Sequence, residues 1–459
     1  MTTRESFPPS ENVLSDKPAV FAGLAYTLVV CLCIASDRLI LALAPILSFF
    51  IVFLIARFKS RVWVVFFFLS NTLTLFVFRG IFWGYSINEF FLFVASLLIP
   101  FLFFSQQRAR LSSLPYLNTF FFLLLALSAS CLHASWNGCL SMNVLRYSIR
   151  FIIFFISFYF LLAMLSNNNF SLALQSYIVS GLLFSIMLFF MVLCLGYPYE
   201  EPGRLSIRNY FFTNWVCCYM ELFFPLTFFL FWGATNTITR IAFGLLALLF
   251  LTSILLTYSK GGLITVSICF LFIFFKDFNL KSFLAGLFLA LLFSIQFLQG
   301  YQHRLSFTDR DQLLSSLTRI ELLKTAGRII SDGALLIGYG INSFAELKNS
   351  YGFYSFIDLK KVMSPHNLYA ELMVSLGLIG FILFFSIILR ILFKLARTKT
   401  VNNVALKYGL LFTIISYLVH GLVDCFLIVP AFSIAFFSVL SFSWFFSENV
   451  KTIDAGQII

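Results

Sequence analysis

The feature that most constrains this chain is a long succession of apolar runs, each about long enough to cross a lipid bilayer. About 30 Å of hydrocarbon takes about 20 apolar residues in a helix. The pattern predicts an all-α, polytopic membrane protein with about 12–14 transmembrane helices. The runs lie at about 18–36, 39–56, 62–78, 86–104, 116–134, 147–165, 172–195, 214–232, 241–258, 261–275, 282–299, 370–392, 405–425 and 430–447.

The composition agrees with a membrane protein. Of the 459 residues, 61% are hydrophobic and 11% are charged, with a mean hydropathy of +0.97, whereas soluble domains are about half apolar and a quarter charged. The net charge of +12 comes from basic residues scattered over short connections. Because they form no basic domain, the charge does not indicate a nucleic-acid partner.

Basic residues fall in alternate connections and predict the orientation of the helices. By the positive-inside rule these connections are cytoplasmic, which places both termini inside and the connections 133–145, 196–213 and 300–369 outside. The polar segment 1–17 does not resemble a cleavable signal peptide. The basic positions are Arg57, Lys59, Arg61, Arg108, Arg110, Arg240, Lys276, Lys281, Arg390, Lys394, Arg397, Lys399 and Lys407.

The connection 300–369 is much longer than a link between two helices requires, and loops of this length are usually functional or disordered. Within it, residues 313–326 carry apolar side chains at helical spacing, which predicts an amphipathic helix. We therefore treat it as a small extracytoplasmic subdomain. The expected organisation is a cytoplasmic tail 1–17, a transmembrane domain 18–299, the loop subdomain 300–369, transmembrane helices in 370–447 and a cytoplasmic tail 448–459.

A histidine stands at the end of this loop. Ser364 and Pro365 directly precede His366 and Asn367, before an apolar helix near Leu368. Ser at the N-cap and Pro at the first helical position predict that His366 lies in the first turn. The positive end of the helix dipole disfavours a protonated imidazole, so a neutral His366 is a candidate general base; the alternative is a surface histidine at a helix start. By spacing, Asn367 is placed to brace Glu371 on the same helix face.

Three cations stand where apolar runs meet the outer face: Arg204, Lys260 and Arg319. Positive residues are depleted on that side, so these three favour an anionic ligand such as the diphosphate of a carrier lipid. The alternative is snorkelling to lipid phosphates.

Three ionisable residues, Arg150, His420 and Asp424, lie within apolar runs. They are functional candidates by position, or else they pair with one another for structural reasons.

The nine cysteines show no metal-binding spacing. Cys131 and Cys139 flank an outer connection, and a disulfide between them is left open. The carboxylates of Asp309 and Asp311, which lie close to Arg304 and Arg310 in the sequence, are the only paired carboxylates in the long loop. We therefore expect no metal site.

Several short segments follow one another in an order that resembles a known family. Over about 200–430 the chain is similar to the O-antigen ligase and polymerase superfamily. It departs from that pattern at Lys260, where Arg is frequent, and at Ser375, where an acidic residue is common. The segments are Gly203-Arg-Leu-Ser206, Phe212-Thr-Asn214, Tyr258-Ser-Lys-Gly-Gly262, Thr318-Arg-Ile320, Gly338-Tyr-Gly-Ile-Asn-Ser-Phe344, the run from His366-Asn367 to Gly377 and Gly380, and His420-Gly-Leu-Val-Asp424.

The resemblance implies a glycosyltransferase of the GT-C type that needs no metal and no cofactor and uses an undecaprenyl-diphosphate-linked oligosaccharide as donor. Two arginines would hold the leaving diphosphate, and a histidine would take the acceptor proton. The catalytic residues it implies are His366, Arg319 and Arg204. The substrate-binding residues are Lys260, Asn367, Arg208 and Asn214.

Three functions fit this resemblance and the predicted topology. We favour an O-antigen polymerase because of the His366-Asn-Leu-Tyr369 form and the chain length; an O-antigen ligase that transfers the glycan to lipid A core is the first alternative. A flippase or other transporter is the non-enzymatic alternative, but we detect no internal repeat. The expected location is the bacterial inner membrane with a periplasmic active site. Expected partners are the bilayer, the lipid-linked oligosaccharide, and a chain-length regulator and flippase of the same pathway, with no nucleic acid.

Overall fold

The computed structural model describes residues 64–65, 67–68, 115–193, 205, 213–276, 310–351, 364–427 and 429–455. Within these residues the regular elements are helices, and seven helical segments are long and apolar enough to cross a membrane. The prediction of a polytopic helical membrane protein is therefore confirmed. The expected spans at about 18–36, 39–56, 86–104 and 282–299, and most of 62–78, lie outside the described residues.

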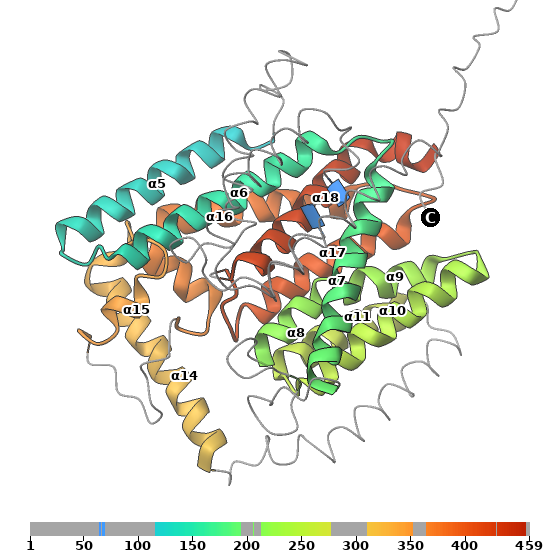
Figure 1. Cartoon of the computed structure of the whole chain (residues 1–459). Helices are drawn as coiled ribbons and strands as arrows, with labels where there is room; N and C mark the ends of the chain where they lie inside the picture. The colour runs from blue at the N-terminus through green and yellow to red at the C-terminus, as the bar shows by residue number, and fades with distance from the viewer. Residues whose placement is uncertain are drawn as a thin grey trace, which may run out of the picture.

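The spanning helices run side by side as a bundle, and the loop helices lie at one end of it (Figure 1). The spans are α5 (Leu117–Trp136), α6 (Met142–Met164), α7 (Phe170–Leu193), α8 (Thr213–Glu221) continued by α9 (Phe224–Gly233), α10 (Thr237–Leu256), α16 (Leu368–Arg397) and α18 (Pro430–Ala455). Two shorter apolar helices are α11 (Lys260–Lys276) and α17 (Val404–His420). The loop helices are α14 (Arg310–Ile329), the π-helical turn η4 (Ile330–Ala334) and α15 (Phe344–Leu347).

The bundle packs through aromatic rings and through glycines that let neighbours approach. Lipid is as apolar as a leucine core, so helices in a membrane associate by close packing rather than by the hydrophobic effect. Tyr177 and Phe223 have ring centroids 4.6 Å apart, and a Cβ added to Gly181 would lie 2.6 Å from the Phe223 ring. At the other end of α9, a Cβ on Gly233 would lie 2.3 Å from that of Ala405.

Helix α14 confirms the amphipathic segment predicted in the loop, and the turn that follows it fits into a break in α16. The break is at Gly377, which has φ 66° and ψ −176°. A broken helix leaves backbone groups without intrahelical partners, which is costly in an apolar environment. Here the amides of Tyr339 and Gly340 donate to α16 carbonyls at 2.9 and 2.8 Å, and the amide of Leu378 donates to the carbonyl of Leu335 at 2.8 Å.

Two glycines allow this junction. A Cβ on Gly338 would lie 2.2 Å from the Ser375 carbonyl carbon, and a Cβ on Gly377 would lie 2.4 Å from the Leu336 oxygen. The backbones of the loop and of α16 are therefore in direct contact. As a result the loop is fixed to the helix that begins just after His366.

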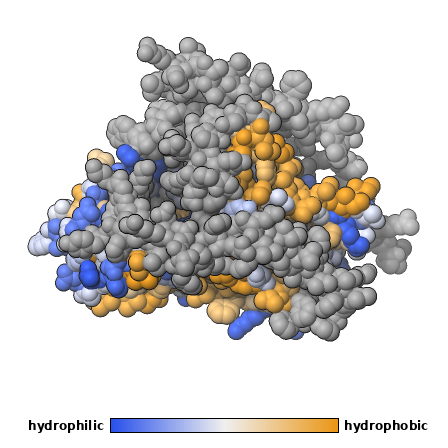
Figure 2. All heavy atoms as spheres, turned by 90° about the horizontal axis from the view of Figure 1, so that it is seen from below, coloured by the Kyte–Doolittle hydropathy of each residue, from blue (hydrophilic) through white to orange (hydrophobic). Residues whose placement is uncertain are grey.

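The surface agrees with a membrane location. Figure 2 shows broad apolar areas between the grey segments, while polar residues gather at the edge near α14 and α15. Exposed apolar side chains lie on several spans, among them Phe121, Leu132, Ile186, Leu245 and Phe393. Such side chains are suited to contact with acyl chains.

Candidate functional site

His366 lies directly before α16 rather than in its first turn, so the predicted helix start is wrong by three residues. The N-cap is Asn367, whose side-chain oxygen accepts from the Ala370 amide at 2.8 Å. Asn is as good an N-cap as Ser, and a tertiary contact favours it here, because its amide nitrogen donates to the Leu422 carbonyl at 2.8 Å. His366 itself adopts a left-handed conformation with φ 50°.

The imidazole of His366 pairs with a buried carboxylate. Its Nδ1 lies 2.9 Å from Oδ1 of Asp424, and 35% of the His366 side chain is exposed against 5% of that of Asp424. The same Oδ1 accepts from the Cys425 amide at 2.8 Å, and Oδ2 accepts from the side-chain amide of Asn214 at 2.9 Å. Asp424 is thus fixed from two sides while His366 reaches the surface.

Electrostatics keep this carboxylate charged. Burial alone would raise the pKa of Asp424. The opposite effect comes from the charge of His366, from its hydrogen bond to Asp424 and from the positive charge of Arg319, which together hold this pKa well below its ordinary value. A carboxylate only accepts hydrogen bonds, so Nδ1 of His366 must be the donor. In the neutral ring, Nε2 is then the basic nitrogen, which is the arrangement a general base requires.

The other predicted site residues fall into three groups. Asn214 is a direct partner of Asp424. Arg319, on α14, is partly buried and lies near enough to Asp424 to affect its pKa, whereas Lys260 is exposed at the first residue of α11. Arg204 and Arg208 lie outside the described residues. Leu205, which follows Arg204 in the sequence, is buried and donates its amide to the Leu256 carbonyl at 2.9 Å.

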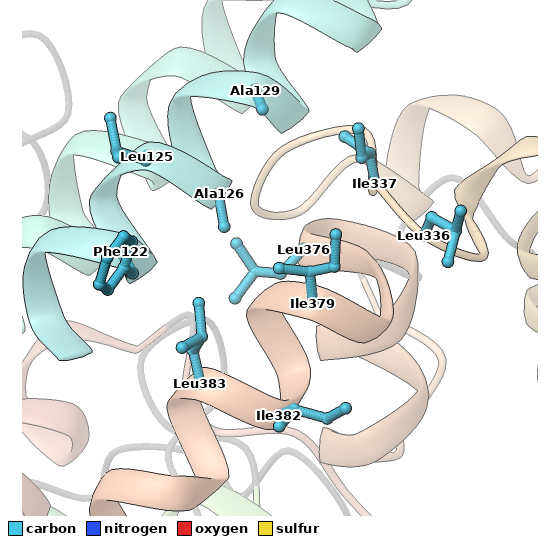
Figure 3. Close-up of a pocket in the computed structure, with 10 residues that line it drawn as sticks. All are labelled: Phe122, Leu125, Ala126, Ala129, Leu336, Ile337, Leu376, Ile379, Ile382 and Leu383. Atoms are coloured by element: carbon cyan, nitrogen blue, oxygen red, sulfur yellow. The ribbon is translucent and has the colours of Figure 1, made fainter.

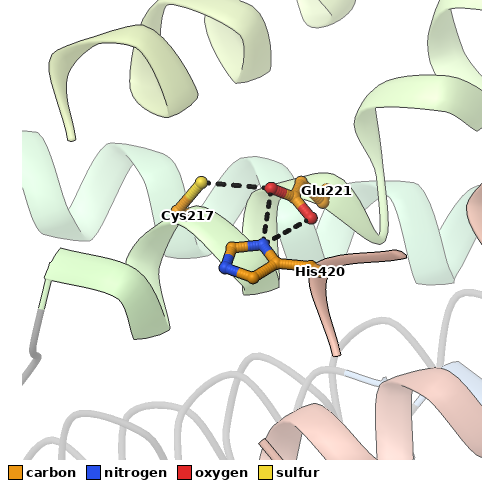
Figure 4. Close-up of side chains that lie close together, drawn as sticks. All are labelled: Cys217, Glu221 and His420. Carbon is orange, nitrogen blue, oxygen red and sulfur yellow. Dashed lines mark hydrogen bonds and ion pairs between the residues drawn. The ribbon is translucent and has the colours of Figure 1, made fainter. Parts of the chain in front are cut away.

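A second buried polar cluster consists of Cys217, Glu221 and His420 (Figure 4). Nδ1 of His420 lies 2.8 and 2.9 Å from the two carboxylate oxygens of Glu221, and the Cys217 thiol donates to one of them at 3.1 Å. The three ligand atoms lie within 4.8 Å of one another, and such a donor set would suit zinc. In this structure the same atoms are hydrogen-bonded to each other.

These contacts replace the pairing considered for Arg150, His420 and Asp424. His420 pairs with Glu221, Asp424 pairs with His366, and the Arg150 guanidinium lies 4.9 Å from the centre of the Tyr147 ring. Glu221 was not among the residues predicted from the sequence. The sequence did contain a signal, because a carboxylate inside an apolar run is energetically unfavourable in a membrane and indicates a partner or a function.

The expected brace between Asn367 and Glu371 is also wrong. The Glu371 carboxylate is buried and accepts hydrogen bonds from the backbone amide of Asn342 at 3.1 Å and from the Ser375 hydroxyl at 3.0 Å. It therefore holds the loop turn against α16. The non-acidic residue at 375 has a local explanation, because a hydroxyl can donate to Glu371 whereas a second carboxylate would repel it.

Cys131 and Cys139 are both free, so the open disulfide is absent from this structure. The Cys131 thiol contacts the Ser148 hydroxyl at 3.5 Å, and that of Cys139 donates to the Asn137 carbonyl at 3.2 Å.

An apolar pocket lies between α5, the loop turn and the residues on both sides of the break in α16 (Figure 3). Its walls include Phe122, Leu336, Ile337 and Ile379, and its labelled side chains are all hydrocarbon. A diphosphate or a sugar would find no hydrogen-bonding side chain there. The candidate chemistry therefore lies at the His366–Asp424 pair and not in this pocket.

Comparison with known proteins adds one finding. Residues 245–385 match the family described as O-Antigen ligase. The match confirms the resemblance to the O-antigen ligase and polymerase superfamily and supports a glycosyltransferase-like activity in a multi-pass membrane protein. No curated protein matches the chain.

Proposed function

We propose that this O-antigen ligase-family protein is an O-antigen polymerase. It moves a growing glycan from undecaprenyl diphosphate to a lipid-linked repeat unit at the periplasmic face of the bacterial inner membrane. The observation that carries the proposal is the pairing of His366 with Asp424 within the field of Arg319. Glycosyl transfer from a diphosphate needs a base for the acceptor proton and a cation for the leaving diphosphate. A histidine with a fixed tautomer beside an arginine supplies both.

In the proposed reaction, Nε2 of His366 takes the proton of the acceptor hydroxyl. The acceptor oxygen bonds to the anomeric carbon of the donor, and the bond from that carbon to the diphosphate oxygen breaks, with the electron pair leaving on the diphosphate. A positioned base contributes about 10²- to 10⁴-fold. Arg319 and Arg204 would stabilise the leaving charge, with Lys260, Arg208, Asn214 and Asn367 as substrate-binding residues.

The proposal includes neither a metal nor a cofactor in the reaction, because cationic side chains can stabilise a leaving diphosphate. It places the enzyme in one pathway with a flippase that delivers the repeat unit and a regulator of chain length. Reporter fusions test the location: a fusion after Lys399 should read cytoplasmic and one near Ser350 periplasmic. A cytoplasmic signal near Ser350 would refute the periplasmic site.

Ligase activity is the second candidate, because the matching family carries the description O-Antigen ligase. The two activities leave different products in a deletion strain. On a lipopolysaccharide gel, core with a single repeat unit indicates lost polymerisation, and bare core indicates lost ligation. We expect the single repeat.

The chemistry is tested by His366→Ala, which should abolish long-chain polymer while the protein remains in the membrane at normal amount. His133→Ala is a matched control, because among the residues that the structure describes the His133 ring bonds a backbone carbonyl, that of Gly338 at 3.1 Å, and stacks on Tyr339. Full-length polymer made by the His366→Ala protein at normal abundance would refute a general base at this position.

A further inference from the structure

The cluster of Glu221 and His420 is more deeply buried than the His366–Asp424 pair. Both side chains are 1% exposed. Glu221 receives three side-chain contacts, since Thr265 donates to Oε2 at 3.2 Å in addition to His420 and Cys217. These contacts join α8, α11 and α17, so one carboxylate ties together three helices.

Glycines bring the helices to this distance. A Cβ on Gly261 would lie 2.7 Å from the His420 ring, and a Cβ on Gly262 would lie 2.4 Å from the Cys217 sulfur. Both glycines follow Lys260 at the start of α11. The backbone of α11 therefore packs directly against the imidazole of His420.

His420 is also the last residue of α17, and the segment after it carries the candidate site. Its carbonyl accepts from the amide of Asp424 at 3.1 Å. The next two carbonyls hold the start of α16: that of Gly421 accepts from the Leu368 amide at 2.7 Å, and that of Leu422 accepts from the Asn367 side chain at 2.8 Å. Asp424 is thus bonded to His420 itself, and the start of α16, directly after His366, is bonded to the two residues that follow His420.

We propose that Glu221 and His420 form a positioning pair that sets the distance between Asp424 and His366. Neither residue touches substrate in this proposal. Glu221 fixes the imidazole at the end of α17, and the fixed helix end holds Asp424 in hydrogen-bonding range of His366. The proposal rests on the proposed function, because it assigns the pair a role only through the general base.

The test compares Glu221→Ala with Glu221→Gln in purified full-length protein. The probe is the lipid-linked repeat unit extracted from a host strain that lacks this protein. A displacement of about 1 Å costs up to about 100-fold in rate, so we expect Glu221→Ala to lower kcat by about 10- to 100-fold with little change in KM. Gln keeps an oxygen that accepts from His420, so Glu221→Gln should retain kcat within about 3-fold, well short of the Ala loss.

Asn169→Ala is the control for a purely structural loss. Asn169 is 1% exposed and bonds the Ser166 amide and the Met164 carbonyl in the connection between α6 and α7. Its loss should lower the melting temperature and leave kcat per folded molecule unchanged. If Glu221→Ala does not fold, Thr265→Val removes one contact to Glu221 and should lower kcat severalfold.

Coupling to the base is the decisive readout. If Glu221 acts through Asp424, Glu221→Ala should cause no further loss in an Asp424→Ala background. The proposal would be overturned if the double variant lost kcat by the product of the two single losses. It would also be overturned if kcat were unchanged in folded Glu221→Ala or in Thr265→Val. Stoichiometric zinc in the purified protein that Cys217→Ala removes would overturn it as well. A His366→Ala protein with full activity would instead refute the proposed function, which the same assay reports separately.

Discussion

Replacing Asp424 by Asn tests the geometry of the general base most directly. The side chains have nearly the same shape, so the change removes a charge without opening a cavity. The carboxylate accepts from the ring of His366 at 2.9 Å, from the Cys425 amide at 2.8 Å and from the Asn214 side chain at 2.9 Å. The outcome depends on which way the new amide turns.

The backbone decides that orientation. Oδ1 of Asp424 receives both the His366 nitrogen and the Cys425 amide, and a backbone N–H cannot become an acceptor. The side chain introduced by Asp424→Asn should therefore keep its oxygen at this position and turn its NH₂ toward Asn214, whose own amide can rotate to offer an oxygen. The tautomer of His366 is then preserved and only the charge is lost.

A hydrogen bond to a charged group is worth about 1.5–3 kcal/mol and one to a neutral group about 0.5–1.5 kcal/mol. Loss of the charge alone, a difference of about 1–1.5 kcal/mol, should therefore lower kcat by about 5- to 13-fold at about 1.4 kcal/mol per factor of ten. An inverted amide would put the proton on the wrong nitrogen and cost about 10⁴-fold, as it does in serine proteases. The assay is single-turnover transfer of the lipid-linked repeat with His366→Ala alongside. A loss below about 2-fold would refute the pairing, and a loss near 10⁴-fold would refute the reasoning from Cys425.

Three further predictions follow from the same contacts. Gly377→Ala should lower the melting temperature clearly, because φ is 66° and the new Cβ would lie 2.4 Å from a backbone oxygen. Gly327→Ala in α14 should be neutral or stabilising, because its new Cβ would have nothing within 4 Å. Arg319→Lys should keep the charge but lose forked phosphate contacts, and so reduce polymer more than Lys260→Arg does; equal mild effects would mean that the diphosphate binds elsewhere. Because the pKa of Asp424 is lowered in the folded state, the carboxylate stabilises the protein above the ordinary carboxyl pKa of about 3.9. The melting temperature difference between wild type and Asp424→Asn should therefore be present at about pH 5 and shrink as the pH falls below about 4.

Periodicity and composition predicted the helical class and one loop helix because those signals are local. The apolar spacing of 313–326 lies within α14, which spans Arg310–Ile329. The same kind of local reading failed at the start of α16. Ser364 and Pro365 form a good start signal, but the contact of Asn367 with Leu422 comes from a distant helix end, and no local pattern contains it.

The partners in the site could not be predicted for the same reason. His366 and Asp424 are 58 positions apart, and Glu221 and His420 are 199 apart. Charged residues in apolar runs signal that a partner exists, but several pairings satisfy that rule equally well. Packing selects among them, and here it does so through glycines such as Gly261, which admits the His420 ring.

The family match also shows how the site is divided along the chain. Residues 245–385 include Lys260, Arg319 and His366, yet the carboxylate that orients the histidine is Asp424, beyond the end of the match. Asn214, its second side-chain partner, precedes the match. The proposed base therefore lies in the matched segment, while the residues that orient it lie on either side.

This division has a physical reason. A histidine placed at the end of a long loop gains no fixed position from the loop, so rigid elements must supply it. Here α16 is attached to the end of α17 by the amide of Leu368 and the side chain of Asn367, while the turn at Gly338 fits into the break at Gly377. The described part of the loop is thus anchored to membrane helices at the turn after α14 and again at the start of α16. The loop places Arg319 near Asp424, and the helix ends keep the proposed base, His366, within hydrogen-bonding distance of that carboxylate.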